Sequence, residues 1–193
     1  MSSNIYQWTI DTEMDFGGRT DGTLGIDKGL PIIFKLLKEH NIKGLFFVST
    51  EVMDKRLGVV QDILNEGHEV GNHGHFHIPF KEPWRQVQSK VIADNILRNY
   101  TNKEYHEFRA PKFSYPLHGH KYSDPYGHIG LLKYTWLGGK IKGDEIFYLH
   151  PFDIVGGTNA PNLFCKIWYS KPEVALENLT RLLNKYPGDC RLG

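Results

Sequence analysis

The stretch Gly44-Leu45-Phe46-Phe47-Val48 decides the fold, because it is a continuous apolar run of strand length. Such a run is typical of a strand in a parallel sheet that helices cover on both faces. Helical patterns stand on either side of it. Apolar residues recur with the helical period between Ile26 and His40, and again between Leu57 and Asn65. The run therefore predicts a buried strand within an α/β fold.

The alternation of strands and helices continues along the chain. Residues 112 to 130 are rich in Gly, Pro, His and Tyr and are expected to form a loop. The other patterns are strands at Ile5–Ile10, His68–Gly71, Phe108–Pro111, Lys133–Leu137 and Glu145–Leu149, and helices at Trp84–Tyr100 and Ser170–Lys185. Buried strands that alternate with helices imply a parallel sheet. At 193 residues, the chain is expected to form a single domain over residues 1–193.

Composition and charge exclude several classes of function. A formal net charge of +1 gives no electrostatic bias toward nucleic acid or an anionic membrane, so no nucleic-acid partner is expected. There is no run of about 18 apolar residues that would predict a transmembrane segment. The first strand pattern begins at Ile5, so a signal peptide is not expected. Cys165 and Cys190 are interpreted as reduced thiols, and the expected location is cytoplasmic.

Two carboxylates, Asp11 and Glu13, follow the first strand pattern two positions apart. If the strand continues, their side chains share one face, because strand side chains alternate with period two. One of them can then bind a metal ion while the other takes a proton from water. The alternative interpretation is that both are solvated acids of a loop.

Histidines stand at positions i and i+4 in His73-Gly74-His75-Phe76-His77, the spacing that lets two side chains meet on one helical turn. The third histidine can replace either neighbour or point at solvent. Arg109 and His150 also end strand patterns. Arg109 can pair with Asp11 and keep it ionised, and His150 is either a buried structural histidine or a proton donor. Active sites of α/β proteins lie at the carboxyl ends of strands, so these positions together predict a catalytic metal site.

In this order, the motifs resemble those of the polysaccharide deacetylase family, which is carbohydrate esterase family 4. That family has an acidic pair after its first strand, then an HxxxH motif, an RxP motif, a Trp-bearing segment and a Leu-His pair. The corresponding residues here run from Ile10 to about Pro151, with Arg109-Ala110-Pro111 and Leu149-His150 as the third and last motifs. The resemblance implies a distorted (β/α) barrel with about seven mostly parallel strands and a short carboxy-terminal end.

The resemblance also implies a role for each residue. Asp11 would be the catalytic base and His150 the general acid, and Arg109 would tune Asp11. One divalent metal ion would be held by Glu13, His73 and His77. Zinc is the first expectation, although cobalt, manganese, nickel or iron also suit these ligands. The expected substrate-binding residues are Lys112, through its backbone N–H, and Phe113, Trp136 and Leu149, the last two in the pocket for the acyl group.

The chain departs from the family pattern in four places. One is Lys112-Phe113, which stands where the family usually has an aromatic residue and then Gly after the RxP motif. The second acid is Glu13, and Thr12 stands where the family usually has its metal-binding aspartate. The aspartate often found in the fourth motif has no counterpart near Trp136. The chain ends at Gly193, just after its last helix pattern, where the family often adds a strand. A short end can leave a sheet edge for a second subunit to cover, so a homo-oligomer is an open expectation.

The expected activity is the metal-dependent hydrolysis of an N-acyl group, first of all an acetamido group, on an amino sugar or saccharide. The products would be acetate and a free amine. One alternative is deformylation of a lipid- or nucleotide-linked formamido sugar, because Thr9-Ile10-Asp11 and Leu36–Ile42 also resemble lipid-linked formamido-arabinose deformylases. Hydrolysis of small non-sugar amides is a second alternative. An alternative of a different class is a non-catalytic, metal-containing sugar-binding module.

Overall fold

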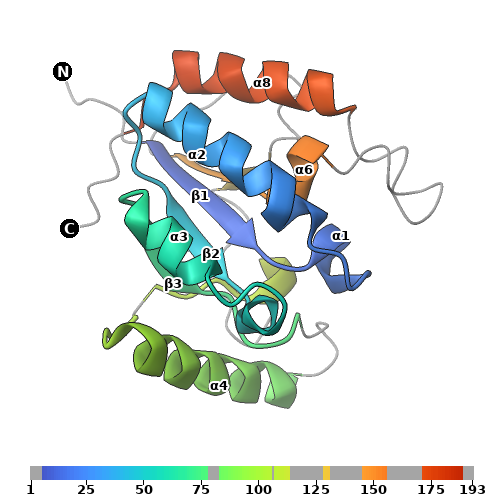
Figure 1. Ribbon diagram of the computed structural model, residues 1–193, viewed down its shortest axis with the longest axis vertical. Coiled ribbons are helices and arrows are strands. Elements are labelled where there is room, and N and C mark those ends of the chain that lie inside the picture. Colours follow the sequence, from blue (N-terminus) through green and yellow to red (C-terminus); the bar gives the residue numbers. More distant parts are fainter. Residues whose placement is uncertain are drawn as a thin grey trace.

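The computed structural model describes residues 6–77, 83–105, 107–113, 128–130, 145–155 and 171–188. Within these residues the predicted α/β fold with a parallel sheet is confirmed (Figure 1). Five strands form one sheet in the order β3-β2-β1-β5-β4, and every pairing is parallel. The strands are β1 (Tyr6–Thr12), β2 (Leu45–Val48), β3 (Glu69–Asn72), β4 (His128–Gly130) and β5 (Glu145–Leu149).

Helices and helical turns connect these strands. They are α1 (Asp15–Gly18), the π-helical turn η1 (Gly25–Gly29), α2 (Leu30–Glu39), η2 (Thr50–Asp54), α3 (Val59–Asn65), α4 (Pro83–Thr101), η3 (Pro111–Phe113), α6 (Pro151–Val155) and α8 (Pro172–Lys185). Figure 1 shows α2 and α8 along one flank of β1, and α4 at the opposite end of the molecule. His40, directly after α2, lies 3.3 Å from Asn184 of α8. Among the described helices, none combines the length and the apolar character that a membrane span requires.

The strand predicted from the apolar run is buried on both faces, as expected. Phe46 and Val48 belong to the main hydrophobic core, which also contains apolar side chains of α2, α3 and α8. Leu45 and Phe47 face the other side of the sheet and pack against Ile146 of β5. Burying a side chain of this size contributes about 2 kcal/mol. Apolar burial therefore stabilises both sides of β2.

The prediction of a strand at Phe108–Pro111 is wrong, because only Phe108 makes a β-bridge, with Asn72, and Pro111 begins η3. The other described elements agree with their predictions except in detail. The helix expected from Ile26 is α2, and the π-helical turn η1 precedes it. The loop expected over residues 112 to 130 contains β4, which is too short for its sequence to show a strand period. The last helix begins at Pro172, and no side chain caps its amino end. The strand expected at Lys133–Leu137 lies outside the described residues.

His68, directly before β3, is a buried histidine of the core. Its ring packs against those of Phe34 and Phe46, with centroid distances of 5.4 and 5.0 Å. Its Nδ1 accepts a hydrogen bond from the backbone N–H of Gly44 at 3.3 Å. Burial lowers the pKa of His68 from 6.5 to about 4. The ring is therefore neutral in the folded protein at neutral pH.

This histidine should make stability depend on pH. The unfolded chain takes up the proton near pH 6.5 and the folded chain only near pH 4, so stability declines as the pH falls between these values. Between about pH 7.5 and about pH 5, the wild type should lose about 2 kcal/mol more free energy of unfolding than a His68→Leu variant. Urea denaturation at the two pH values measures both losses. Equal losses in the two proteins would contradict the expectation.

Candidate metal centre and active site

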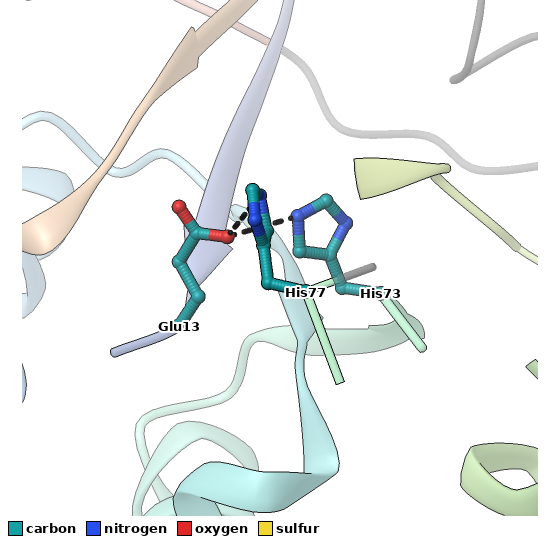
Figure 2. Close-up of side chains that lie close together, drawn as sticks. All are labelled: Glu13, His73 and His77. Atoms are coloured by element: carbon teal, nitrogen blue, oxygen red, sulfur yellow. Dashed lines mark ion pairs between the residues drawn. The ribbon is translucent and has the colours of Figure 1, made fainter. Parts of the chain in front are cut away.

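Three candidate metal ligands meet at the carboxyl ends of the strands. Glu13 follows β1, His73 follows β3, and His77 lies in the same loop as His73. Glu13 Oε2 is 3.3 Å from Nε2 of His73 and 3.1 Å from Nε2 of His77 (Figure 2). One ligand atom of each residue lies within 4.8 Å of the others. The structure thus brings together all three residues that were expected to hold the metal ion.

This donor set fits a divalent metal ion. Glu13 Oε2 is buried, and among the described residues it has no hydrogen-bond partner. A buried carboxylate oxygen without a partner is unfavourable, and a cation between Glu13 and the two imidazoles would satisfy it. Nδ1 of His73 lies 2.8 Å from the carbonyl oxygen of Arg109, to which it can donate, and this leaves Nε2 as the ligand atom.

The charges around the three ligands also favour a cation. Burial opposes the protonation of His73, but the negative charges of Asp11 and Glu13 raise its pKa above the ordinary value. The site therefore attracts positive charge when it holds no metal ion. Burial lowers the pKa of His77, which keeps that ring neutral, as a metal ligand must be.

The two histidines do not share a helical turn, so that part of the prediction was wrong. Residues 73–77 form a loop, in which Gly74 has a φ of +84°. Ser89 of α4 fixes this loop, because its Oγ accepts a hydrogen bond from the backbone N–H of His75 at 2.7 Å. A Cβ atom on Gly74 would lie 2.9 Å from that oxygen. The ring of His75 contacts Thr50 at 3.0 Å and takes no part in the ligand group.

Asp11 lies at the end of β1 and is paired with a buried arginine. Arg109 donates from Nη1 to Oδ1 of Asp11, and from Nη2 to Oγ1 of Thr9 at 2.7 Å. The guanidinium group lies over the ring of Phe47, 4.4 Å from its centroid. Burial opposes the ionisation of Asp11, but the charge of Arg109 brings the pKa of Asp11 below its ordinary value. The expected ion pair is present, and it holds Asp11 as a carboxylate.

His150 follows β5 and faces both acids. Its Nε2 is 3.9 Å from Oδ2 of Asp11 and 3.5 Å from Oε1 of Glu13. The ring stacks on Phe152, with 4.8 Å between the centroids. Burial disfavours the protonated ring, but the charges of Asp153, Glu13 and Asp11 outweigh burial and raise the pKa of His150 to about 9. His150 is therefore a protonated donor at neutral pH.

Asp153 is the site residue that the sequence interpretation missed. Its Oδ2 accepts a hydrogen bond from the backbone N–H of His150 at 2.7 Å and lies 3.2 Å from Nδ1 of the same residue. Nδ1 thus faces a carboxylate while Nε2 faces the site. The signal was in His150-Pro151-Phe152-Asp153, because Pro opens a helical turn and places residue i+3 back over residue i.

Gly29 of η1 lets the His150–Asp153 turn pack closely against η1. The turn of α6 packs against η1, and a Cβ atom on Gly29 would lie only 1.9 Å from the carbonyl oxygen of Pro151. A larger residue at position 29 would therefore push the His150–Asp153 turn away from η1. The general acid expected from the sequence depends on this close approach.

The expected substrate-binding residues lie in three different environments. Trp136 lies outside the described residues. Lys112 and Phe113 lie in η3, and the ring of Phe113 meets that of Tyr148 edge-on at 5.1 Å. Leu149 is 2 % exposed and belongs to the main hydrophobic core. Contacts of these residues with a substrate stay predictions.

The sequence matches the pattern of the polysaccharide deacetylase family over residues 21–126. That range contains His73, His77 and Arg109, but it contains neither the two acids after β1 nor His150. A peptidoglycan-N-acetylglucosamine deacetylase of Bacillus cereus is 45 % identical over 108 residues, which are 55 % of this chain and 34 % of that protein. The chain thus spans about a third of the length of this curated relative.

Solved structures of carbohydrate esterase family 4 share the fold. A pseudoenzyme of that family from Bacillus anthracis has a TM-score of 0.63 at 17 % identity, over 96 % of this chain and 61 % of its own. The peptidoglycan deacetylase PdaC from Bacillus subtilis has a TM-score of 0.62 at 13 % identity, over 95 % of this chain and 85 % of its own. At such identities the likeness shows the fold alone, and this fold is the α/β arrangement expected from the sequence.

Proposed function

Because the chain belongs to the polysaccharide deacetylase family, we propose that it hydrolyses the N-acyl group of an amino sugar or saccharide. The products would be a short carboxylate, first of all acetate, and a free amine. One observation carries this proposal. The candidate metal-ligand group lies beside an ionised carboxylate, Asp11, and a protonated histidine, His150, at the carboxyl ends of parallel strands. A metal ion, a base for the attacking water and an acid for the leaving nitrogen are together sufficient for metal-dependent hydrolysis of an amide.

Glu13, His73 and His77 would hold the ion, and zinc is the first candidate by its preference for histidine and carboxylate ligands. Cobalt, manganese, nickel and iron also accept this set. A divalent ion supplies Lewis-acid chemistry, which polarises a carbonyl group and makes water more acidic. The protein's own part is to bind the amide, orient it and move two protons.

Asp11 would take the first proton. Its Oδ1 is held by Arg109, whereas its Oδ2 faces His150 across 3.9 Å. This arrangement fixes the carboxylate with one oxygen directed at the space between the two groups. Water placed there can lose a proton to Oδ2 as its oxygen attacks the carbonyl carbon. We further propose that the backbone N–H of Lys112 donates to the oxyanion that develops.

His150 would give the second proton. Cleavage of the C–N bond would expel an unstable amide anion unless the nitrogen is protonated as it leaves. Nε2 of His150 faces the site, and Asp153 holds the other side of the ring. Proton loss to Asp11 and proton gain from His150 thus occur on opposite sides of one amide.

Amine release from a panel of formyl and acetyl amino sugars tests the proposal. The sugars are presented free, nucleotide-linked and lipid-linked to metal-loaded protein, with chelator-treated protein as the control. Release of acetate from an acetylated saccharide supports the proposal. Release of formate alone would assign the deformylase activity instead, and hydrolysis only of small non-sugar amides would also overturn the sugar assignment. Metal binding without hydrolysis of any substrate would favour the sugar-binding module.

Asp153 should matter for turnover although it does not touch the substrate. An Asp153→Asn variant still offers an oxygen to the backbone N–H of His150, but it lacks the charge that keeps the ring protonated. We expect turnover to fall about tenfold or more, with an unchanged metal content. NMR titration of the His150 ring should show a lower pKa than in the wild type. An Asp62→Asn variant, at an exposed acid of α3, is the matched control. An unaltered pKa of His150 in Asp153→Asn would contradict this role.

A further inference from the structure

The ring of His150 is held at its face as well as at its edge. Asp153 contacts the edge, with 3.2 Å between its Oδ2 and Nδ1 of His150. A contact at one atom leaves the ring free to turn about that atom. Phe152 removes this freedom, because its ring stacks on that of His150 with 4.8 Å between the centroids and 22° between the planes. The two contacts together fix the direction of Nε2, the atom that would give the proton.

Phe152 is in turn held by the loop that follows β1. Its side chain is buried, and its ring lies 5.5 Å from that of Phe16. Its backbone lies against η1, because a Cβ atom on Gly25 would lie 2.6 Å from the backbone nitrogen of Phe152. Asp15 fixes this part of η1, since its carboxylate accepts hydrogen bonds from the backbone N–H groups of Leu24 and Gly25, both at 2.8 Å. Two adjacent residues thus support Phe152, Asp15 through η1 and Phe16 through its ring.

The backbone of Phe16 has a conformation that a bulky residue rarely adopts. Its φ is +58° and its ψ is +35°, and Gly17 and Gly18 continue the left-handed turn with φ values of +70° and +69°. Such a conformation favours glycine, and phenylalanine is an outlier there. Strained residues of this kind are concentrated at functional sites. The contact with Phe152 gives a reason for a ring at a position whose backbone favours glycine.

The two phenylalanine rings lie beside the candidate site and not in the main hydrophobic core. Among the described residues, that core includes side chains of β1 and α6 but neither Phe16 nor Phe152, although both are buried. Phe16 comes three residues after Glu13, the candidate metal ligand. Phe152 comes two residues after His150. The pair of rings therefore joins the segment that would hold the metal ion to the segment that would give the proton.

We propose that Phe152 and Phe16 are positioning residues for the proposed general acid, in which Phe152 holds the plane of the His150 ring and Phe16 holds Phe152. This inference rests on the proposed function and names the side chains that direct its acid. Neither phenylalanine can bind a metal ion or give a proton. A displacement of about 1 Å in a reacting group can cost about 100-fold in rate. Loss of either ring should therefore slow the step in which Nε2 of His150 protonates the leaving nitrogen, and it should leave metal binding unchanged.

A Phe152→Leu variant tests the first contact, because it removes the flat ring but keeps a buried apolar side chain. The measured quantity is the turnover of an N-acetyl amino sugar divided by that of a 4-nitrophenyl ester, whose leaving group needs no proton. We expect this ratio to fall about tenfold or more, with an unchanged affinity for zinc. Phe152→Tyr keeps a ring and should keep the wild-type ratio. A merely structural role would lower both activities together or weaken the binding of zinc.

A Phe16→Gly variant separates the effect of the ring from that of the backbone, because glycine accepts the positive φ without strain. The ratio of amide to ester turnover should fall here too, although the left-handed turn is kept. Phe16→Leu is the second variant if the glycine variant does not fold. The matched control is Phe34→Leu. Phe34 also contacts a phenylalanine and a histidine, Phe46 at 5.5 Å and His68 at 5.4 Å, but its contacts lie outside the candidate site. This control should lose stability and keep the wild-type ratio.

NMR of the His150 ring in the zinc-loaded protein tests the geometry without turnover. Protons that lie over the face of an aromatic ring are shifted upfield. The ring signals of His150, assigned by their absence from His150→Ala, should therefore move downfield in Phe152→Leu. They should also move in the Phe16 variants, because Phe152 is then no longer held. Phe34→Leu should leave them in place.

Each other outcome overturns the inference. It is wrong if Phe152→Leu or the Phe16 variants keep the wild-type ratio, if they lose both activities equally, or if the His150 signals stay in place. A changed ratio in Phe34→Leu would also contradict it, because the effect would then not depend on contact with His150. A wild type that hydrolyses no N-acyl amino sugar would contradict the proposed function. The NMR shifts would then decide alone whether the two rings hold His150.

Discussion

A His150→Ala variant is expected to lose turnover by about 100- to 10,000-fold while it keeps its metal ion. The ring provides the only acid that the proposed mechanism offers to the leaving nitrogen, and it is not among the three candidate metal ligands. Its side chain is also 23 % exposed, so little packing is lost with it. Steady-state kinetics and metal analysis of the purified variant measure both effects. His40→Ala, at the end of α2 and outside the candidate site, is the matched control.

The leaving group allows a sharper version of this experiment. A 4-nitrophenyl ester releases a stable phenolate that needs no proton, whereas a sugar amide needs one to release its amine. His150→Ala should therefore lose far more activity toward the amide than toward the ester. Equal losses for both substrates, or retained hydrolysis of the amide, would remove His150 from the role of general acid.

A Glu13→Ala variant is expected to bind the metal ion more weakly by about two orders of magnitude or more. Even the partners of metal ligands affect affinity by about 10- to 100-fold, so that loss of a ligand should have a larger effect. Glu13 is the only carboxylate in the ligand group, and its Oε2 lies between the two imidazoles. Titration of the apoprotein with zinc against a chromophoric chelator measures the affinity.

The control for Glu13 is a nearby carboxyl group outside the ligand group. Glu51 lies in η2 and is half-buried. Burial raises its pKa most, and the charge of the nearby Glu13 raises it further. Glu51→Gln should keep the wild-type affinity for zinc. Undiminished binding by Glu13→Ala would assign the third ligand to another acid and would separate this chain from the ligand pattern that its motifs resemble.

The sequence predicts those features that follow from the geometry of a parallel sheet. A run that is apolar at every position, Leu45–Val48, has to be buried on both faces, and it is. Side chains at the carboxyl ends of parallel strands have to meet at one edge of the sheet. Asp11 and His150, near the ends of β1 and β5, therefore lie together although they are distant in the chain. Arg109 follows the isolated β-bridge of Phe108 with Asn72 and joins them by pairing with Asp11.

Other features depend on contacts that the local sequence does not contain. The HxxxH spacing predicts a helical turn, but Gly74 adopts a positive φ, and Ser89, on a different element, fixes the loop. The acid that orients His150 is three residues away in the sequence. Its spacing is visible in the local sequence, but the close packing of α6 against Gly29, which positions the turn, is not. Local patterns thus located the candidate functional residues and the partner of Asp11, but not Ser89 or Asp153, which fix the ligand loop and His150.

The order of the strands has a consequence for how the protein is made. All three candidate ligands precede residue 78, whereas His150 follows β5, which pairs with β1 from a distant part of the chain. During synthesis, the emerging chain thus contains a complete ligand set before it contains its general acid, and the pairing of β5 with β1 comes late because it joins distant segments. A metal ion captured at that stage would sit in a nascent chain that still lacks its candidate general acid, which follows β5.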